Sequence, residues 1–96
     1  MNQAPPTIAD LRNEIDGVDE RLIKLLAERQ RLVEAVIMIK KRDGIAARVP
    51  ARVDYVVDRA RVLARAHHLD PVLAETIWTE MVEWFVGHEE RELEKH

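Results

Sequence analysis

The sequence predicts an all-α fold with three helices in each chain, the first of them very long. Apolar residues recur at alternating steps of four and three through the first half of the chain, which is the spacing of a helical seam. The 96 residues include only three glycines and four prolines, so few positions break a helix. Aromatic residues make up 4% of the chain and apolar–polar alternations are scarce, which disfavours a β-sandwich or barrel.

Composition excludes several classes of protein. At ~100 to 200 residues per domain, the length allows one domain, and 47% apolar with 34% charged residues is a globular balance. Cysteine is absent, which excludes disulfide scaffolds, thiolate metal sites and cysteine nucleophiles. No apolar run reaches the ~18 residues of a membrane span, and the N-terminus lacks signal-peptide features. We therefore expect no membrane partner and a cytoplasmic location.

Charge is distributed unevenly along the chain. The formal net charge is −3, but residues 1–69 hold 13 basic and 10 acidic side chains, whereas residues 70–96 hold 2 and 8. Eleven of the fifteen cations are arginine, whose planar fork suits carboxylates and phosphates. The cations are dispersed among acids without a stacking platform, so nucleic acid is not an expected partner.

The first predicted helix begins after Thr7, a good N-cap with Asp10 three positions later. Residues 1–7 are expected to form a disordered tail. Asp43 and Gly44 supply the C-terminal stop. The apolar seam of this helix consists of Leu11, Ile15, Val18, Leu22, Leu25, Leu32, Val36 and Ile39.

The length of this helix predicts an intertwined homodimer. About 36 residues at ~1.5 Å each form a rod of roughly 54 Å, while a compact chain of this size is only about 32 Å across. One chain cannot cover the whole seam, so a second copy is the expected partner. A break near Gly17 is the alternative, but glycine costs a helix only ~1 kcal/mol relative to alanine.

A second helix is expected after a loop over residues 45–49. Pro50 suits a helix start, and the apolar stripe ends near His67 and His68. The inward positions of this helix are Val53, Val56, Val57, Ala60, Leu63 and Ala64.

A third helix is expected after Asp70, an N-cap followed by Pro71 in the first turn. The acidic stretch from His88 is expected to fray, so that the folded domain spans residues 8–91 and residues 92–96 form a frayed tail. The inward positions of this helix are Leu73, Ile77, Trp78, Val82 and Phe85.

Charged residues also fall on these apolar faces. Lys40 lies eleven residues after Arg29, three turns with only ~20° of drift, so both point the same way. Glu89 continues the inward row of the third helix. An isolated buried charge costs several kcal/mol unless it is paired, so these residues form either a structural ion network, such as Arg29 with Glu89, or a polar ligand site. Arg52 adds a third cation, and this excess favours an anionic ligand.

Other candidate sites are weaker. Adjacent His67 and His68 point about 100° apart on a helix and no third ligand has suitable spacing, so a helix-end role is favoured over metal binding. Glu83, Glu90 and Glu92 are most simply a solvated face. The sequence holds no Ser-His-Asp set, glycine-rich phosphate loop or His-Glu-x-x-His motif. We expect neither a metal nor a cofactor.

Three stretches of the chain together resemble a known family. They are Leu11-Arg12-x-x-Ile15-Asp16-x-x-Asp19-x-x-Leu22-Ile23-x-Leu25-Leu26-x-x-Arg29, then Lys40 with Arg52, then the turn His67-His68-Leu69-Asp70. The family is the all-helical class of chorismate mutase. The similarity covers nearly the whole chain; it is specific in the first helix and the turn, and looser between Lys41 and Pro50.

This resemblance implies two interlocked chains with two equivalent sites. Carried over, Arg12 comes from the neighbouring subunit and joins Arg29 and Lys40 of the long helix and Arg52 of the second helix. Independently, Arg12 and Arg29 are ~25 Å apart along one helix, too far to share a small ligand within one chain. The other substrate-binding positions that the resemblance implies are Val49, Val53, Phe85 and Glu89.

The implied reaction is the pericyclic rearrangement of chorismate to prephenate, an isomerase step of the shikimate pathway to the aromatic amino acids. Negative charge develops on the ether oxygen, so the reaction needs positioning and fixed electrostatics but no metal, cofactor or nucleophile. Arg12 and Arg29 clamp the two carboxylates of the dianionic substrate, and Lys40 donates to the ether oxygen. The expected catalytic residues are Lys40, Glu89 and Arg29.

Three positions depart from the family pattern. Glu89 stands where many mutases have glutamine and can donate a hydrogen bond only when protonated. Acidic pH is therefore expected to favour activity, and Glu89→Gln to flatten the pH profile. Val53 stands where mutases commonly hold the ring hydroxyl with glutamate, and Phe85 replaces a serine that contacts the substrate in some members.

These departures leave alternatives open. Val53 and the pair Trp84 and Phe85 resemble the isochorismate-pyruvate lyases of salicylate and siderophore synthesis, which use the same fold and cationic clamp. A mutase of 4-amino-4-deoxychorismate is a further alternative. The rival class is a non-enzymatic helical dimerisation module, which the inward cation excess disfavours because such a module gains nothing from unpaired buried cations.

Overall fold

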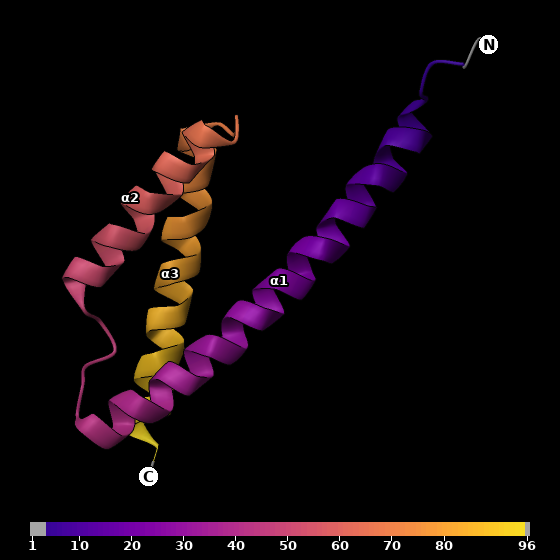
Figure 1. The fold of residues 1–96 in the computed structure, drawn as a ribbon. Coiled ribbons are helices and arrows are strands. Elements are labelled where there is room, and N and C mark those ends of the chain that lie inside the picture. Colours follow the sequence, from indigo (N-terminus) through magenta and orange to yellow (C-terminus); the bar gives the residue numbers. More distant parts are fainter. Residues whose placement is uncertain (1–3, 96) are drawn as a thin grey trace. The chain divides into compact units, whose positions relative to one another are not determined.

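The computed structural model describes residues 4–95 and contains three α-helices there (Figure 1). Helix α1 spans Ile8–Asp43, α2 spans Pro50–Ala66 and α3 spans Pro71–Glu94. The predicted all-α class with a very long first helix is confirmed. None of these described helices is long and apolar enough to cross a membrane. The predicted tails reach residues 1–3 and 96, which lie outside the described part of the chain; residues 4–7 form no helix or strand.

Helix α1 begins at the predicted cap and runs for 36 residues without a break. Thr7 N donates to Asp10 Oδ2 at 2.9 Å, and Asp10 N donates to Thr7 Oγ1 at 3.1 Å. This reciprocal pair satisfies backbone amides that the helix itself leaves unpaired. The hydrogen bonds from Thr7, that from its backbone N–H above all, lower the pKa of the Asp10 carboxyl. The alternative of a break near Gly17 is excluded, because this glycine lies inside the continuous helix.

The loop after α1 starts where the sequence predicts the stop. Gly44 has φ +69°, in the left-handed region, and Ile45 N donates to the Lys40 carbonyl at 2.9 Å. This is the bond that closes a Schellman-type helix end. At the far side of the loop, Val49 is extended with φ −116° and Pro50 occupies the first turn of α2.

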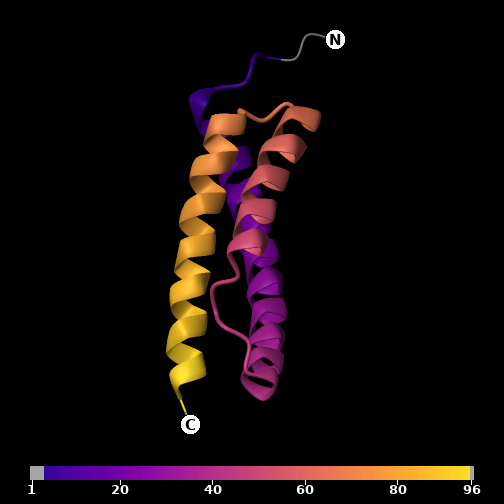
Figure 2. The same ribbon diagram turned by 90° about the vertical axis from the view of Figure 1, so that its left-hand side faces the viewer.

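Helices α2 and α3 form a hairpin and pack side by side (Figure 2). His68 has φ +60° at the turn, and Leu69 N donates to the Ala64 carbonyl at 2.8 Å. Asp70 Oδ1 then accepts a hydrogen bond of 2.8 Å from Val72 N at the start of α3. The predicted helix end at the two histidines and the predicted Asp70 cap are both confirmed.

The chain divides into two compact units, one up to Glu34 and one from Ala35 onward. Within its described residues the first unit contains a single helical element, the N-terminal part of α1, so its apolar seam has no second element to pack against in that unit. The side chains of the predicted seam are 43–64% exposed. Six of them lie in this unit, Leu11, Ile15, Val18, Leu22, Leu25 and Leu32, and two lie in the second unit, Val36 and Ile39.

The second unit contains the end of α1, the loop, α2 and α3, and it holds a small core. Three of its buried residues are alanines on the facing helices α2 and α3, which lets the two backbones approach closely. The buried apolar residues are Ile37, Ala47, Ala60, Ala64, Ala74, Val82, Phe85 and Val86.

Two features of this unit differ from the prediction. Leu63, Leu73 and Ile77 were predicted to face inward but are 40–48% exposed, because each helix of the hairpin covers only one stripe of the other. The prediction that the stretch from His88 frays is also wrong, since α3 is helical to Glu94. A cation in the last turn complements the helix dipole there, and Lys95 Nζ lies 2.7 Å from Glu92 Oε1.

Candidate functional site

The two inward charges of opposite sign meet in the second unit. Lys40 Nζ, near the end of α1, lies 2.9 Å from Glu89 Oε1 of α3. The same ammonium group donates a hydrogen bond of 2.9 Å to the carbonyl of Ala47 in the loop. Both charged side chains are largely buried, with 14% and 10% of their surface exposed. Three separate elements therefore converge on one lysine.

The contact between Lys40 and Glu89 is an ion pair without good hydrogen-bond alignment. Glu89 Oε1 is buried and accepts no well-aligned hydrogen bond from the described residues, although the ammonium lies within ion-pair distance of it. An ammonium group carries three N–H donors. The carbonyl of Ala47 takes one and the attraction of the carboxylate directs a second, which leaves one donor for another acceptor.

This pairing changes the charge balance expected from the sequence. Arg29 is the example partner suggested for Glu89 from the sequence, whereas the structure places Lys40 beside this carboxylate. Of the cations counted as inward from the sequence, Lys40 of this unit is paired with Glu89 and Arg52 is exposed. The inward positions of Lys40 and Glu89 themselves are confirmed by their burial.

Phe85 lies one turn before Glu89 on the same helix and is 9% exposed. Its ring meets that of Trp84 edge-on, with centroids 5.0 Å apart and an interplanar angle of 86°. Trp84 itself is 54% exposed. The buried carboxylate thus has a large apolar neighbour along α3 in place of a polar side chain.

The start of α2 carries three further residues that the sequence assigns to the site. Arg52 N and Val53 N donate to the carbonyl of Val49 at 2.9 and 3.1 Å, which fixes the first turn. Val53 is half-buried, whereas Val49 and Arg52 are exposed. The guanidinium of Arg52 lies 5.2 Å from the ring centre of Tyr55, in reach of a cation–π interaction. This contact was not predicted from the sequence, although residues three positions apart are neighbours on a helix surface.

Arg12 and Arg29 belong to the other unit, on the N-terminal part of α1. Arg12 is exposed and Arg29 is half-buried. Because they lie on one unbroken helix, their positions are about 25 Å apart along its axis. A single chain does not bring these two arginines to the same small molecule.

A second ion pair joins the loop to α3 and was not predicted. Arg48 Nη1 donates to Glu83 Oε1 at 3.0 Å and Arg48 Nη2 donates to Glu83 Oε2 at 2.6 Å, a bidentate fork. These hydrogen bonds hold the pKa of the Glu83 carboxyl below its ordinary value. The sequence predicts a solvated role for Glu83, because no local spacing links residues 35 positions apart.

Arginine, lysine and one buried carboxylate on an all-helical frame define a class of proteins that bind small anions through fixed charge. Among residues 4–95 no three histidine, aspartate or glutamate side chains are placed to hold a metal ion. The chemistry that these groups offer is electrostatic: orientation of an anion, and hydrogen-bond donation to an oxygen that gains charge.

Comparison with known proteins gives this class a family. A family model described as chorismate mutase type II matches residues 11–90. The chorismate mutase of Methanocaldococcus jannaschii is 36% identical over 76 residues, which are 79% of this chain and 77% of that protein. The T-protein of Enterobacter agglomerans is 39% identical over 67 residues, 70% of this chain but only 18% of the T-protein. The chain belongs to the chorismate mutase type II family, as its resemblance predicts.

Proposed function

We propose that the protein is a chorismate mutase, which rearranges chorismate to prephenate. The observation that carries the proposal is the largely buried Lys40, held by Glu89 and Ala47 with one donor left, in a chain that belongs to this family. The reaction breaks the ether C–O bond while a C–C bond forms within the same molecule, so no group is transferred to the protein. A fixed cation near the ether oxygen stabilises the negative charge that develops there.

Each site residue has a role in this proposal. Lys40 donates its third N–H to the ether oxygen. Glu89, when protonated, donates to the same oxygen, and when ionised it can only accept. Arg29 and Arg52 bind carboxylate oxygens of the substrate, and Arg12 of the partner subunit completes the clamp. Together these cations favour the compact conformer in which the two reacting carbons lie near each other.

A fully assembled site then requires a homodimer. The support is the exposed seam of α1, of which the six residues up to Leu32 lie in a unit that offers them no packing partner among the described residues. Burying apolar surface contributes about 25 cal/mol of favourable free energy per Å². Burial of the eight aliphatic side chains of the seam against a second chain would therefore favour association. A second copy of the same helix supplies both the missing cover and the second arginine.

Two apolar residues at the proposed site make it necessary to test which substrate the protein uses. Val53 and Phe85 cannot accept a hydrogen bond from a ring hydroxyl, so isochorismate is tested beside chorismate. Purified protein is incubated with each compound, and prephenate, salicylate and pyruvate are measured. We expect prephenate from chorismate. Salicylate with pyruvate from isochorismate as the main reaction would assign the lyase instead, and turnover of neither would leave a dimerisation module.

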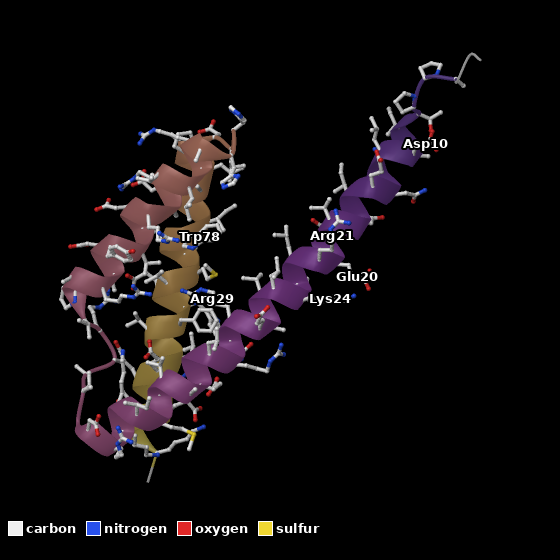
Figure 3. The ribbon with its side chains drawn as sticks, in the orientation of Figure 1. Asp10, Glu20, Arg21, Lys24, Arg29 and Trp78 are labelled. Carbon is white, nitrogen blue, oxygen red and sulfur yellow. The ribbon has the colours of Figure 1, made fainter. Side chains whose placement is uncertain are left out.

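A matched control separates the site from the rest of α1. Lys24 projects from the same helix on the side of Glu20 (Figure 3), and the two charged groups are 4.0 Å apart and well exposed. We expect Lys24→Met to keep full activity, whereas Lys40→Met should lose nearly all of it. Equal losses would remove Lys40 from the mechanism.

A further inference from the structure

The loop between α1 and α2 is held at two consecutive residues. Ala47 is buried, at 9% exposure, and its carbonyl accepts the hydrogen bond from Lys40 Nζ at 2.9 Å. The next residue, Arg48, makes the bidentate fork to Glu83 of α3. The backbone bonds at the two ends of the loop, Ile45 N to Lys40 O and Arg52 N to Val49 O, do not reach this middle part.

We propose that Arg48 and Glu83 are positioning residues for Lys40. The inference rests on the proposed function, in which Lys40 donates to the substrate. Arg48 and Glu83 act through the loop: their fork fixes the peptide group whose carbonyl orients the ammonium. Neither side chain needs to touch the substrate.

The planar peptide bond between Ala47 and Arg48 links the position of Arg48 to the direction of the Ala47 carbonyl. The carbonyl of Ala47 and the N–H and Cα of Arg48 belong to one rigid planar group. When the side chain of Arg48 is fixed to α3, the Cα of Arg48 is restrained, and the direction of the Ala47 carbonyl is restrained with it. The backbone hydrogen bonds of the loop lie only at its two ends, so the fork adds a restraint that its middle part lacks.

The direction of that carbonyl decides where the last donor of Lys40 points. With one N–H donated to the Ala47 carbonyl and the ammonium drawn toward the carboxylate of Glu89, the direction of the remaining N–H is restrained. Without the carbonyl, the ammonium can turn both free donors toward the carboxylate of Glu89. Its charge would remain and still attract an anion, but the donor aimed at the reacting oxygen would be lost.

This distinction predicts a specific kinetic signature. Loss of the fork should lower kcat, which depends on the donor in the transition state, and leave KM little changed, since KM depends on the total charge. Both side chains of the fork are nearly half exposed, so it restrains the loop only moderately. We expect kcat to fall by about two- to fivefold in Arg48→Gln or Glu83→Gln, the range of an exposed ion pair.

The control is another arginine–glutamate ion pair in the same unit, in which the arginine also pairs with Asp58. Arg61 Nη2 lies 2.9 Å from Glu75 Oε1 and joins α2 to α3, with no contact to the loop among the contacts of these two residues. Arg61→Gln and Glu75→Gln change the net charge by the same amounts as the two loop variants. They should leave kcat and KM unchanged, which separates local orientation from a general change of charge.

The test combines kinetics of the whole protein with hydrogen exchange of the loop amides. We expect both loop variants to lower kcat and to speed exchange at residues 46–48, and the charge swap Arg48→Glu with Glu83→Arg to restore both. Unchanged exchange would show that the fork does not hold the loop. Faster exchange with unchanged kcat would show that the carbonyl does not direct Lys40.

Two further outcomes would overturn the proposal in distinguishable ways. If Arg48→Gln raises KM while Glu83→Gln has no effect, Arg48 binds the substrate directly. If the unaltered protein turns over neither chorismate nor isochorismate, the proposed function fails and with it the catalytic role of the fork. The exchange measurement then still decides whether Arg48 and Glu83 fix the loop.

Discussion

Lys40 Nζ and Glu89 Oε1 lie 2.9 Å apart at a largely buried point between α1 and α3. Burying two opposite charges costs desolvation energy that their attraction does not always repay. A well-packed apolar pair at the same positions can be as stable. Stability alone therefore gives little reason for an ion pair at these positions. A site that presents a fixed cation to an anion does give a reason, because the paired carboxylate helps to hold the lysine in place.

Removing one partner of this pair should lower the free energy of unfolding more than removing both partners. Lys40→Met leaves the carboxylate of Glu89 without its counter-charge and the carbonyl of Ala47 without its donor. We expect the free energy of unfolding to fall by about 1–3 kcal/mol, the cost of an unsatisfied buried polar group. The measurement is urea unfolding followed by circular dichroism, at a fixed protein concentration so that any contribution from the proposed dimer is the same in each sample.

The double variant Lys40→Met with Glu89→Leu provides the control. Its loss of stability should be smaller than that of Lys40→Met alone, because no uncompensated charge remains. If the double variant loses as much stability as Lys40→Met and Glu89→Leu lose singly when their losses are added, the pair does not behave as a coupled buried unit.

Glu89 should make the reaction depend on pH. An ionised carboxylate has no N–H or O–H to donate, while the protonated acid has one. Because only the protonated acid can donate to the ether oxygen, kcat for chorismate should be higher at acidic than at neutral pH. In Glu89→Gln the amide donates at every pH, so the activity at neutral pH should rise and the profile flatten. Steady-state kinetics of both proteins across the same buffers measures this.

Two outcomes of the pH–activity measurement would contradict the proposed role of Glu89. The same pH dependence in Glu89→Gln as in the unaltered protein would remove Glu89 from the reaction. Loss of activity at every pH in this variant would instead assign the carboxylate a role in holding Lys40.

Arg12 and Arg29 allow a test of the proposed shared site by complementation. Each homodimer of Arg12→Ala or Arg29→Ala lacks one arginine in both sites and should be nearly inactive. In a mixed dimer, one site receives both intact arginines and the other receives neither. Unfolding and refolding an equal mixture should therefore restore about a quarter of the normal activity, given random pairing of two subunits.

The complementation also tests the geometry against its alternative. If each site used Arg12 and Arg29 of the same chain, no mixed dimer would contain an intact pair, and activity would stay at the level of the parents. The separation of about 25 Å along α1 already argues against that arrangement.

Local signals in the sequence were sufficient to predict where the helices begin and end. The Thr7–Asp10 cap, the Gly44 stop and the Asp70 cap act through neighbouring backbone groups, so they can be read from a few adjacent residues. The burial of hairpin residues was less predictable: Leu73 has the right periodicity but is 48% exposed. Periodicity shows which face is apolar, and only packing shows what covers that face.

The site was predictable only where a charge interrupts an apolar row. Lys40 and Glu89 could be found in this way, and their burial agrees. The partner of Lys40 in the loop is a backbone carbonyl, which any residue type at position 47 would supply. The fork between Arg48 and Glu83 joins segments far apart in the sequence, so its existence depends on the loop conformation, which no local pattern determines.

Gly44 and Gly17 should respond to alanine in opposite directions. A Cβ at either position meets no atom within 4 Å, so packing does not distinguish them. Gly44 has φ +69°, where a side chain costs roughly 1–2 kcal/mol, and Gly44→Ala should destabilise the protein by about that amount. Gly17 lies in the helix interior, where alanine is favoured by about 0.8–1.0 kcal/mol, so Gly17→Ala should stabilise it. Urea unfolding of the two variants at equal concentration measures both effects, and a loss of stability in Gly17→Ala would mean that a neighbouring chain approaches the backbone of α1 too closely there to admit a methyl group.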